Sequence, residues 1–132
     1  MKTVLIVDDS ATILLSLEGL LARAGFRVAK AGDGYEALEK LQAGLRPDLV
    51  ITDLHMPGMD GISLVREVRR RRAFRFVPIL MLTTESQQAK RREARAAGAT
   101  GWLVKPVGAD HLLGVLRRVL PGTETRLGED WR

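Results

Sequence analysis

The chain has 132 residues, of which 45% are hydrophobic and 28% are charged, and this composition is typical of one folded domain with one core. It contains no cysteine, which excludes disulfide frameworks, zinc–thiolate sites, iron–sulfur clusters and thiol nucleophiles. The 21 Lys and Arg residues outnumber the 16 Asp and Glu residues, for a net charge of +5, so nucleic-acid binding has to be considered. The basic residues gather in two helical blocks, 69–72 and 90–95, and no nucleic-acid recognition motif accompanies them, so we do not expect nucleic-acid binding.

Short apolar runs alternate with longer amphipathic segments along the chain. The apolar runs are typical of strands that are buried on both faces of a parallel sheet, and we expect strands over 3–7, 26–29, 49–52, 79–82 and 102–104. The amphipathic segments have apolar residues at helical spacing, and we expect helices over 13–24, 37–43, 62–68, 87–97 and 112–120. Five strand–helix pairs predict an α/β fold, a single doubly wound (flavodoxin-like) five-stranded parallel sheet of order 2-1-3-4-5 with five helices.

The limits of the domain follow from the same pattern. We expect the domain to occupy residues 1–120, followed by a polar C-terminal tail over 121–132 that is too short to fold alone. No apolar run is long enough to span a bilayer, and the first residues lack the zones of a signal peptide. We therefore expect a cytoplasmic protein without membrane insertion.

Polar residues follow four of the five expected strands. Asp8 and Asp9 come after the first strand and Asp53 after the third, while Thr83 and Lys105 follow the fourth and fifth strands. Each of them alone has an ordinary explanation as a helix cap, a turn or a solvated loop residue. Because the carboxyl ends of parallel strands meet at one edge of the sheet, we expect them to converge there on a functional site.

The chemistry of these side chains suits a phosphoryl group. Three neighbouring carboxylates repel one another, and Mg²⁺, which prefers oxygen ligands, would relieve the repulsion at Asp8, Asp9 and Asp53 together with a loop carbonyl. A carboxylate can attack phosphorus, and phosphoryl transfer depends on charge neutralisation and positioning. We therefore expect Asp53 to be the phospho-acceptor, with Lys105 and the Thr83 hydroxyl near the other phosphoryl oxygens.

Four sequence segments resemble the response-regulator receiver domain, and most of all its stand-alone chemotaxis (CheY-type) members. They cover residues 1 to about 120 in the order and spacing of that family. The segments are Val-Leu-Ile-Val-Asp8-Asp9-Ser, Ile-Thr-Asp53-Leu-His-Met-Pro57-Gly-Met-Asp-Gly61, Met-Leu-Thr83-Thr and Gly-Trp102-Leu-Val-Lys105-Pro106. The resemblance implies that a histidine kinase or a phosphotransfer protein donates a phosphoryl group to Asp53. It also implies that Mg²⁺ binds Asp8, Asp9, Asp53 and the backbone carbonyl of His55, and that the peptide bond before Pro106 is cis.

The same resemblance assigns further residues to switching and to the phosphoryl lifetime. Thr83 is the expected sensor, and Trp102, the aromatic residue on the fifth strand, is the expected rotamer switch. The alternative is that Trp102 packs permanently on the last helix. His55 and Glu85 stand two residues after Asp53 and Thr83, at the positions expected to set the lifetime of the phosphoryl group.

The helix over 87–97 has only alanines as apolar residues, so it buries little surface and can shift at low cost. We expect its basic residues and Trp102 to bind an acidic protein partner, on the face formed by the fourth helix, the fifth strand and the fifth helix. An ordinary solvated helix face is the alternative. The basic residues are Lys90, Arg91, Arg92 and Arg95.

The function favoured by the sequence is a monomeric, single-domain response regulator of a two-component phosphorelay, most of all in chemotaxis. It is not expected to be an enzyme, beyond catalysing its own phosphorylation and dephosphorylation. The alternatives are a phosphorelay shuttle and a phosphate sink for a shared kinase. An aspartyl-phosphate phosphatase is a more distant alternative, because the chain lacks a cap insertion and has Asp8 and Asp9 side by side.

Overall fold

The computed structural model describes residues 1–120, and the expected tail over 121–132 lies outside them. Five parallel strands form one sheet in the order β2-β1-β3-β4-β5, which confirms the predicted fold. The strands are β1 (Thr3–Val7), β2 (Arg27–Ala31), β3 (Leu49–Thr52), β4 (Ile79–Thr83) and β5 (Gly101–Val104). The helices are α1 (Ala11–Arg23), α2 (Gly34–Gln42), α3 (Gly61–Arg69), α4 (Gln88–Ala97) and α5 (Ala109–Val119), with a 3₁₀ turn, η1 (Arg72–Phe74), after α3.

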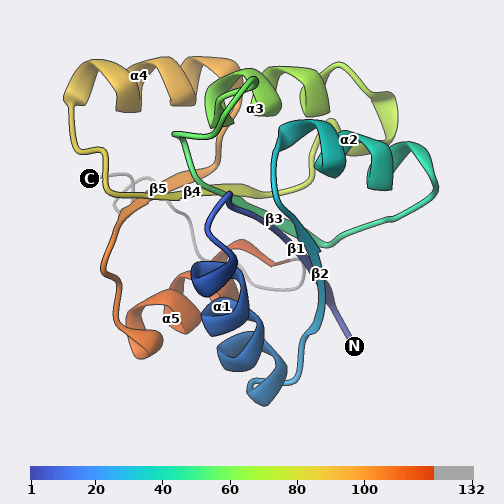
Figure 1. Cartoon of the computed structure of the whole chain (residues 1–132), viewed down its shortest axis with the longest axis vertical. Coiled ribbons are helices and arrows are strands. Elements are labelled where there is room, and N and C mark those ends of the chain that lie inside the picture. Colours follow the sequence, from blue (N-terminus) through green and yellow to red (C-terminus); the bar gives the residue numbers. More distant parts are fainter. Residues whose placement is uncertain (121–132) are drawn as a thin grey trace.

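Helices cover both faces of the sheet, with α1 and α5 on one side and α2, α3 and α4 on the other (Figure 1). Side chains alternate between the two layers along each strand. On β1, for example, Leu5 packs into the layer under α2–α4, and Ile6 packs into the layer under α1 and α5. This burial on both faces explains why β1, β3 and β4 have continuous apolar sequences.

Hydrogen bonds explain two differences between the predicted and the observed limits of the elements. Helix α1 starts two residues before the predicted position because the Ser10 hydroxyl accepts a hydrogen bond from the backbone N–H of Ile13. Strand β2 runs to Ala31, two residues beyond its predicted end, because all five of its residues pair with β1. The turn η1 begins at Arg72, the last residue of the arginine run that starts at the end of α3, and it was not predicted.

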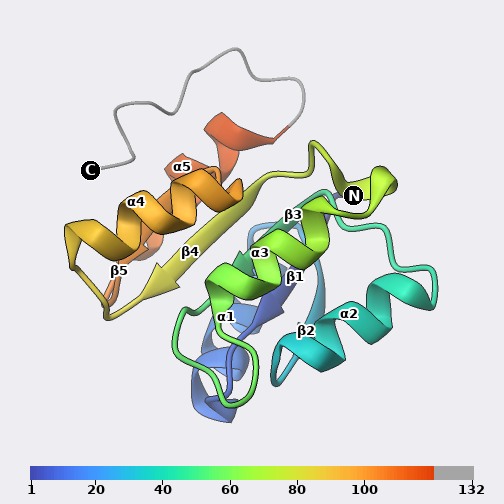
Figure 2. The ribbon, with the colours of Figure 1, turned by 90° about the horizontal axis from the view of Figure 1, so that it is seen from above.

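The sheet has a carboxyl edge, at the ends of the strands, and an amino edge, at their beginnings. The loops after β1, β3, β4 and β5 lie at the carboxyl edge. The segments before β3 and β4 lie at the amino edge, on the same side of the molecule as the N-terminus (Figures 1 and 2). Within residues 1–120, no helix has the length and apolarity needed to cross a membrane.

Candidate functional site

The carboxyl edge brings together the polar residues that the sequence placed there. One carboxylate oxygen from each of Asp8, Asp9 and Asp53 lies within 4.8 Å of the other two. Asp8 is buried, Asp53 is half-buried and Asp9 is exposed, so the cluster opens to solvent on the side of Asp9. The donor set consists of oxygen atoms only, which fits a hard divalent cation such as Mg²⁺ and does not fit a metal that prefers sulfur or imidazole.

The ammonium group of Lys105 lies between two of the carboxylates. Its Nζ donates hydrogen bonds to Oδ2 of Asp8 at 2.7 Å and to Oδ2 of Asp53 at 3.2 Å. Burial lowers the pKa of Lys105, but the hydrogen bond to Asp8 and the charges of Asp53 and Asp8 outweigh burial, and its pKa is raised above the ordinary value. Lys105 is therefore a cation throughout the physiological range, and it offsets part of the negative charge at this edge.

Backbone contacts fix the position of Asp53. Its N–H donates to the carbonyl of Val7 on the neighbouring strand at 3.0 Å, and its Oδ1 accepts a hydrogen bond from the N–H of Leu54 at 2.6 Å. At Gly61 the chain passes so close to the Asp53 carbonyl oxygen that a Cβ atom there would overlap it. The loop between Asp53 and α3 is therefore closely folded over the end of β3.

The loops that carry Asp8 and Lys105 also have a defined backbone conformation. Oδ1 of Asp8 accepts a hydrogen bond from the Ser10 N–H at 2.9 Å. Because Ser10 caps α1, the carboxylate of Asp9 is not used as the helix cap and faces the cluster. The peptide bond between Lys105 and Pro106 is cis, as the family resemblance implied.

Thr83 and Trp102 are both buried behind the site. The Thr83 hydroxyl accepts a hydrogen bond from the N–H of Glu85 at 3.2 Å. Trp102 is 1% exposed, and its indole Nε1 donates to the carbonyl oxygen of Glu85 at 3.1 Å. The indole packs in the layer under α2–α4, so the alternative that it packs on α5 is wrong. Both side chains thus contact one residue of the loop between β4 and α4.

The structure brings His55 and Glu85 into contact. Nε2 of His55 lies 3.1 Å from Oε1 of Glu85, and the imidazole is largely exposed. The other carboxylate oxygen of Glu85 accepts hydrogen bonds from the N–H groups of Ser86 and Gln87, at the start of α4. The hydrogen bonds from Gln87 and from His55 lower the pKa of Glu85 below its ordinary value.

The expected partner-binding surface needs two corrections, because Trp102 and Arg91 are both buried and offer no surface to a partner. Arg91 is only 9% exposed, because it faces inward on the same side of the helix as Ala94, three residues later. Its guanidinium carbon lies 5.9 Å from the centroid of the Trp102 ring, and its Nε is buried without a hydrogen-bond partner. The cationic face of α4 therefore consists of Lys90, Arg92 and Arg95.

One further arginine has a role that the sequence did not reveal, because we treated residues 69–72 as a charge block. Arg69 donates from Nε and NH2 to the carbonyl of Gly98, at 3.1 and 2.8 Å, and from NH1 to the carbonyl of Phe74 at 2.9 Å. It ties the end of α3 to the end of α4. The predicted helix over 62–68 stopped before Arg69, whereas Arg69 is the last residue of α3.

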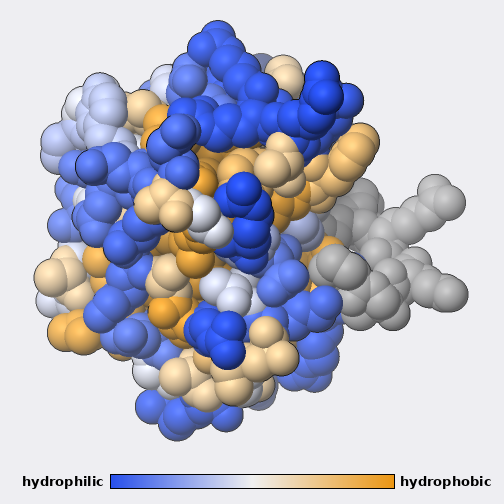
Figure 3. Space-filling view, turned by 90° about the vertical axis from the view of Figure 1, so that its right-hand side faces the viewer, coloured by the Kyte–Doolittle hydropathy of each residue, from blue (hydrophilic) through white to orange (hydrophobic). Residues whose placement is uncertain are grey.

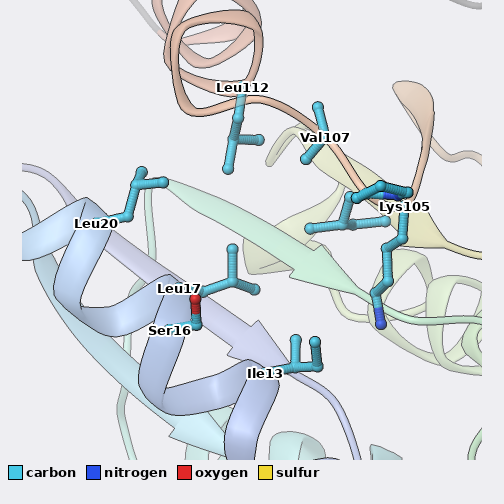
Figure 4. Close-up of a pocket in the computed structure, with 9 residues that line it drawn as sticks. Ile13, Ser16, Leu17, Leu20, Lys105, Val107 and Leu112 are labelled. Atoms are coloured by element: carbon cyan, nitrogen blue, oxygen red, sulfur yellow. The ribbon is translucent and has the colours of Figure 1, made fainter.

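An apolar hollow of about 240 Å³ lies between α1 and α5, beside the site (Figure 4). Leu17 and Leu20 of α1 face Val107 and Leu112 across it, and the Lys105 side chain lies at one end. The three carboxylates do not line it. It is therefore distinct from the charged cluster and shares only Lys105 with it.

Comparison with known proteins places these features in context. The family model described as "Response regulator receiver domain" matches residues 4–117. The "Chemotaxis protein CheY1" of Helicobacter pylori is 42% identical over 103 residues, which are 77% of this chain and 83% of that protein. The "Chemotaxis protein CheY" of Pseudomonas aeruginosa is 39% identical over 117 residues, which are 88% and 94% of the two chains. Among solved structures, chemotaxis protein CheY4 of Vibrio cholerae matches with a TM-score of 0.87 and 48% identity, over 91% of this chain and 99% of that chain.

Proposed function

The chain belongs to the response regulator receiver domain family, and from this premise we propose that it is a cytoplasmic signalling switch that accepts a phosphoryl group on Asp53. One observation carries the proposal: three aspartates converge at the carboxyl edge, with the ammonium of Lys105 bonded to two of them. A carboxylate at the end of a central strand, with a cation beside it, is suited to attack phosphorus.

In the proposed reaction, a carboxylate oxygen of Asp53 attacks the phosphorus of a phosphohistidine on a histidine kinase or a phosphotransfer protein. The P–O bond to Asp53 forms as the P–N bond breaks, and the imidazole nitrogen leaves. Lys105 stabilises the negative charge of the transferred group, and the Thr83 hydroxyl can turn toward one of its oxygens. Asp8, Asp9, Asp53 and the His55 backbone carbonyl would hold Mg²⁺, which neutralises charge on the phosphoryl oxygens when bound.

The switch in this proposal runs from Thr83 to the α4–β5–α5 face. A hydroxyl that turns toward the phosphoryl group gives up its hydrogen bond with the N–H of Glu85. The carbonyl of the same residue holds the Trp102 indole, so the β4–α4 loop and Trp102 respond together. The exposed residues Arg92 and Arg95 then meet an acidic segment of the downstream partner. The chemotaxis assignment draws on relatives and a solved structure that are named as chemotaxis proteins.

We propose that the chain turns over no substrate other than its own phosphoryl group.

The phosphorylation of Asp53 is tested by intact-mass analysis after incubation with acetyl phosphate, with and without Mg²⁺, for the wild type and for Asp53→Asn. The expected result is a single phosphoryl adduct that requires Mg²⁺ and is absent from Asp53→Asn.

A second measurement covers the case of a short-lived adduct. Beryllofluoride forms a stable complex at phospho-acceptor sites, and Trp102 fluorescence would report it in a Trp131→Phe background, since the chain has two tryptophans. If neither an adduct nor a fluorescence change occurs, the proposal is wrong.

A further inference from the structure

The amino edge of the sheet, opposite the proposed phosphorylation site, carries exposed arginines around an exposed aromatic ring. The segments before β3 and before β4 meet there, and Figure 3 looks onto this side of the molecule, where hydrophilic side chains gather around exposed hydrophobic surface. We call Arg46, Arg72, Arg75 and Phe76 the Phe76 patch. All four residues are exposed, and Phe76 is 88% exposed.

The patch includes a hollow with an apolar wall. Pro47, Val77 and Pro78 line it together with the patch residues, and its volume is about 330 Å³. Single exposed hydrophobic side chains are common on proteins. Here an exposed phenyl ring, an apolar hollow and three arginines occur together, and this combination resembles the centre and rim of a binding surface.

The arginines of the patch keep their charge available to a partner. Within residues 1–120, the side chains of Arg72 and Arg75 form no ion pair and no hydrogen bond. Arg46 is held over the Phe74 ring and donates to backbone carbonyls, so it has no carboxylate partner either. The carboxylate of Asp48, which also lines the hollow, accepts a hydrogen bond from the Thr3 N–H at 2.8 Å, and with one carboxylate beside three arginines the patch keeps a net positive charge.

We propose that the Phe76 patch docks an acidic peptide segment of a partner protein. Carboxylates of that segment pair with the three arginines, whose planar guanidinium groups suit bidentate binding, and an apolar side chain enters the hollow beside Phe76. A concave hollow of this size fits a side chain of a peptide. Nucleic-acid binding draws on roughly six to ten phosphate contacts, and anionic membrane surfaces on clusters of about four to eight basic residues. The three arginines of the patch surround one hollow that takes a single apolar side chain, and this arrangement favours a peptide segment over either surface.

The location of the patch determines when it binds. The amino edge is at the opposite end of the strands from Asp53 and shares no residue with the α4–β5–α5 face. A partner bound at the amino edge leaves Asp53 and the α4–β5–α5 face accessible. Such a partner therefore binds the chain whether or not Asp53 is phosphorylated. This inference does not depend on the proposed phosphorylation.

The test measures the binding of a fluorescein-labelled polyglutamate peptide with a central leucine, by fluorescence anisotropy at low salt. The double variant Arg72→Glu, Arg75→Glu is expected to weaken binding about tenfold or more, and Phe76→Ser about fivefold. The matched control is Arg23→Glu, Arg117→Glu, which changes two exposed arginines on α1 and α5 and gives the same net charge. It is expected to change the affinity less than about twofold.

Several results would overturn the proposal. These are no peptide binding to the wild type, an equal loss in the control, or no effect of Phe76→Ser. Patch-dependent binding of anionic vesicles or duplex DNA without peptide binding would assign the patch to those surfaces instead. Circular dichroism of each variant checks the fold. In an Arg92→Glu, Arg95→Glu background, which removes most of the cationic face of α4 as a second site for the acidic peptide, beryllofluoride is expected to leave the peptide affinity unchanged. A large change with beryllofluoride would contradict binding in both states while leaving phosphorylation of Asp53 supported.

Discussion

Nε2 of His55 and Oε1 of Glu85 lie 3.1 Å apart, so a hydrogen bond joins the loop after β3 to the loop after β4. The Glu85 carboxylate also accepts hydrogen bonds from the N–H groups of Ser86 and Gln87, just before α4. Gln87 is the N-cap residue of α4, and its side chain makes no capping hydrogen bond. Both N–H groups belong to residues that precede the helix, so Glu85 orders the segment that leads into α4, and His55 is hydrogen-bonded to that segment through Glu85. The two positions that the sequence associated with phosphoryl lifetime form one unit with the start of α4.

The first prediction is that His55→Ala shortens the phosphoryl lifetime. The substitution frees the Glu85 carboxylate and removes an imidazole beside the site, so water reaches the phosphoryl group more easily. A contact between an exposed imidazole and a partly exposed carboxylate is weak, so we expect a change of about two- to fivefold in rate. The measurement is the loss of the phosphoryl adduct with time. Glu85→Gln, which still accepts a hydrogen bond from the imidazole, should change the rate less, and identical lifetimes for His55→Ala and wild type would exclude the role.

The second prediction concerns the metal. Millimolar Mg²⁺ is expected to stabilise the folded chain, because a ligand at ten times its dissociation constant that binds only the folded state adds about 1.4 kcal/mol. For a domain of this size that raises the melting temperature by about 5 °C. Asp9→Asn should abolish the shift, since Asp9 is the exposed member of the cluster and can be changed with little effect on packing. Asp110→Asn, an exposed acidic residue at the start of α5, should keep it. Calorimetry with and without Mg²⁺ measures the melting temperature of each variant. A Mg²⁺-induced rise in Asp9→Asn as large as in the wild type would place the metal elsewhere.

The third prediction is that Arg91→Met stabilises the protein. The unpartnered Nε of Arg91 costs about 1–3 kcal/mol, because a buried donor has lost its water, whereas the contact with the Trp102 ring returns about 0.5–1 kcal/mol. The desolvation term is larger, and methionine fills similar space without a polar atom. We expect a gain of about 1 kcal/mol in the free energy of unfolding, measured by urea denaturation. The neighbouring Arg92→Met, on the exposed face, should be neutral, and a loss of stability in Arg91→Met would mean that the ring contact dominates.

The sequence predicted the fold and the five residues at the carboxyl edge for the same reason. Continuous apolar runs identify strands of a parallel sheet, and the ends of such strands must meet, so Asp53 and Lys105 could be placed together although 52 positions separate them. Nothing comparable constrains the loops. The contact between His55 and Glu85 depends on two loop conformations that periodicity does not encode.

Arg91 shows a different limit of sequence reasoning. Counting charges along α4 assigned it to the exposed surface, although its spacing of three from the buried Ala94 places it on the inner face. Burial of an arginine is unusual, so composition outweighed spacing in that prediction. The burial results from the large Trp102 ring, which supplies a surface for the guanidinium and which only the folded structure brings into contact with α4.

The fourth prediction is that Gly61→Ala damages the site as well as the fold. A Cβ at this position would overlap the Asp53 carbonyl oxygen, and backbone there cannot move without moving the phospho-acceptor. We expect a loss of about 2 kcal/mol or more and a lower yield of the phosphoryl adduct. The control is Gly114→Ala in α5, where an added Cβ meets no atom within 4 Å and helix propensity favours alanine by up to about 1 kcal/mol. Equal stability of the two variants would show that the loop after β3 can relax.

The last prediction compares two adjacent arginines that the sequence does not distinguish. Arg69 is half-buried and donates three hydrogen bonds to the carbonyls of Gly98 and Phe74, and burial lowers its pKa without a carboxylate partner. Arg70 is exposed and pairs with Glu67 on its own helix. Arg69→Met leaves two carbonyls unsatisfied and should cost about 2–3 kcal/mol, whereas Arg70→Met should cost less than about 0.5 kcal/mol.

Urea denaturation of the two variants separates these roles, and the Trp102 environment adds a second readout. Because Arg69 holds the end of α4 at Gly98, its loss should also allow α4 to move and change Trp102 fluorescence in the folded state, in the Trp131→Phe background. Arg69→Lys provides one donor group where three hydrogen bonds are made, so it should recover only part of the stability. If Arg69→Met and Arg70→Met cost the same, α4 is anchored mainly by Ala94 and its apolar neighbours, and the tie from α3 does not limit its movement.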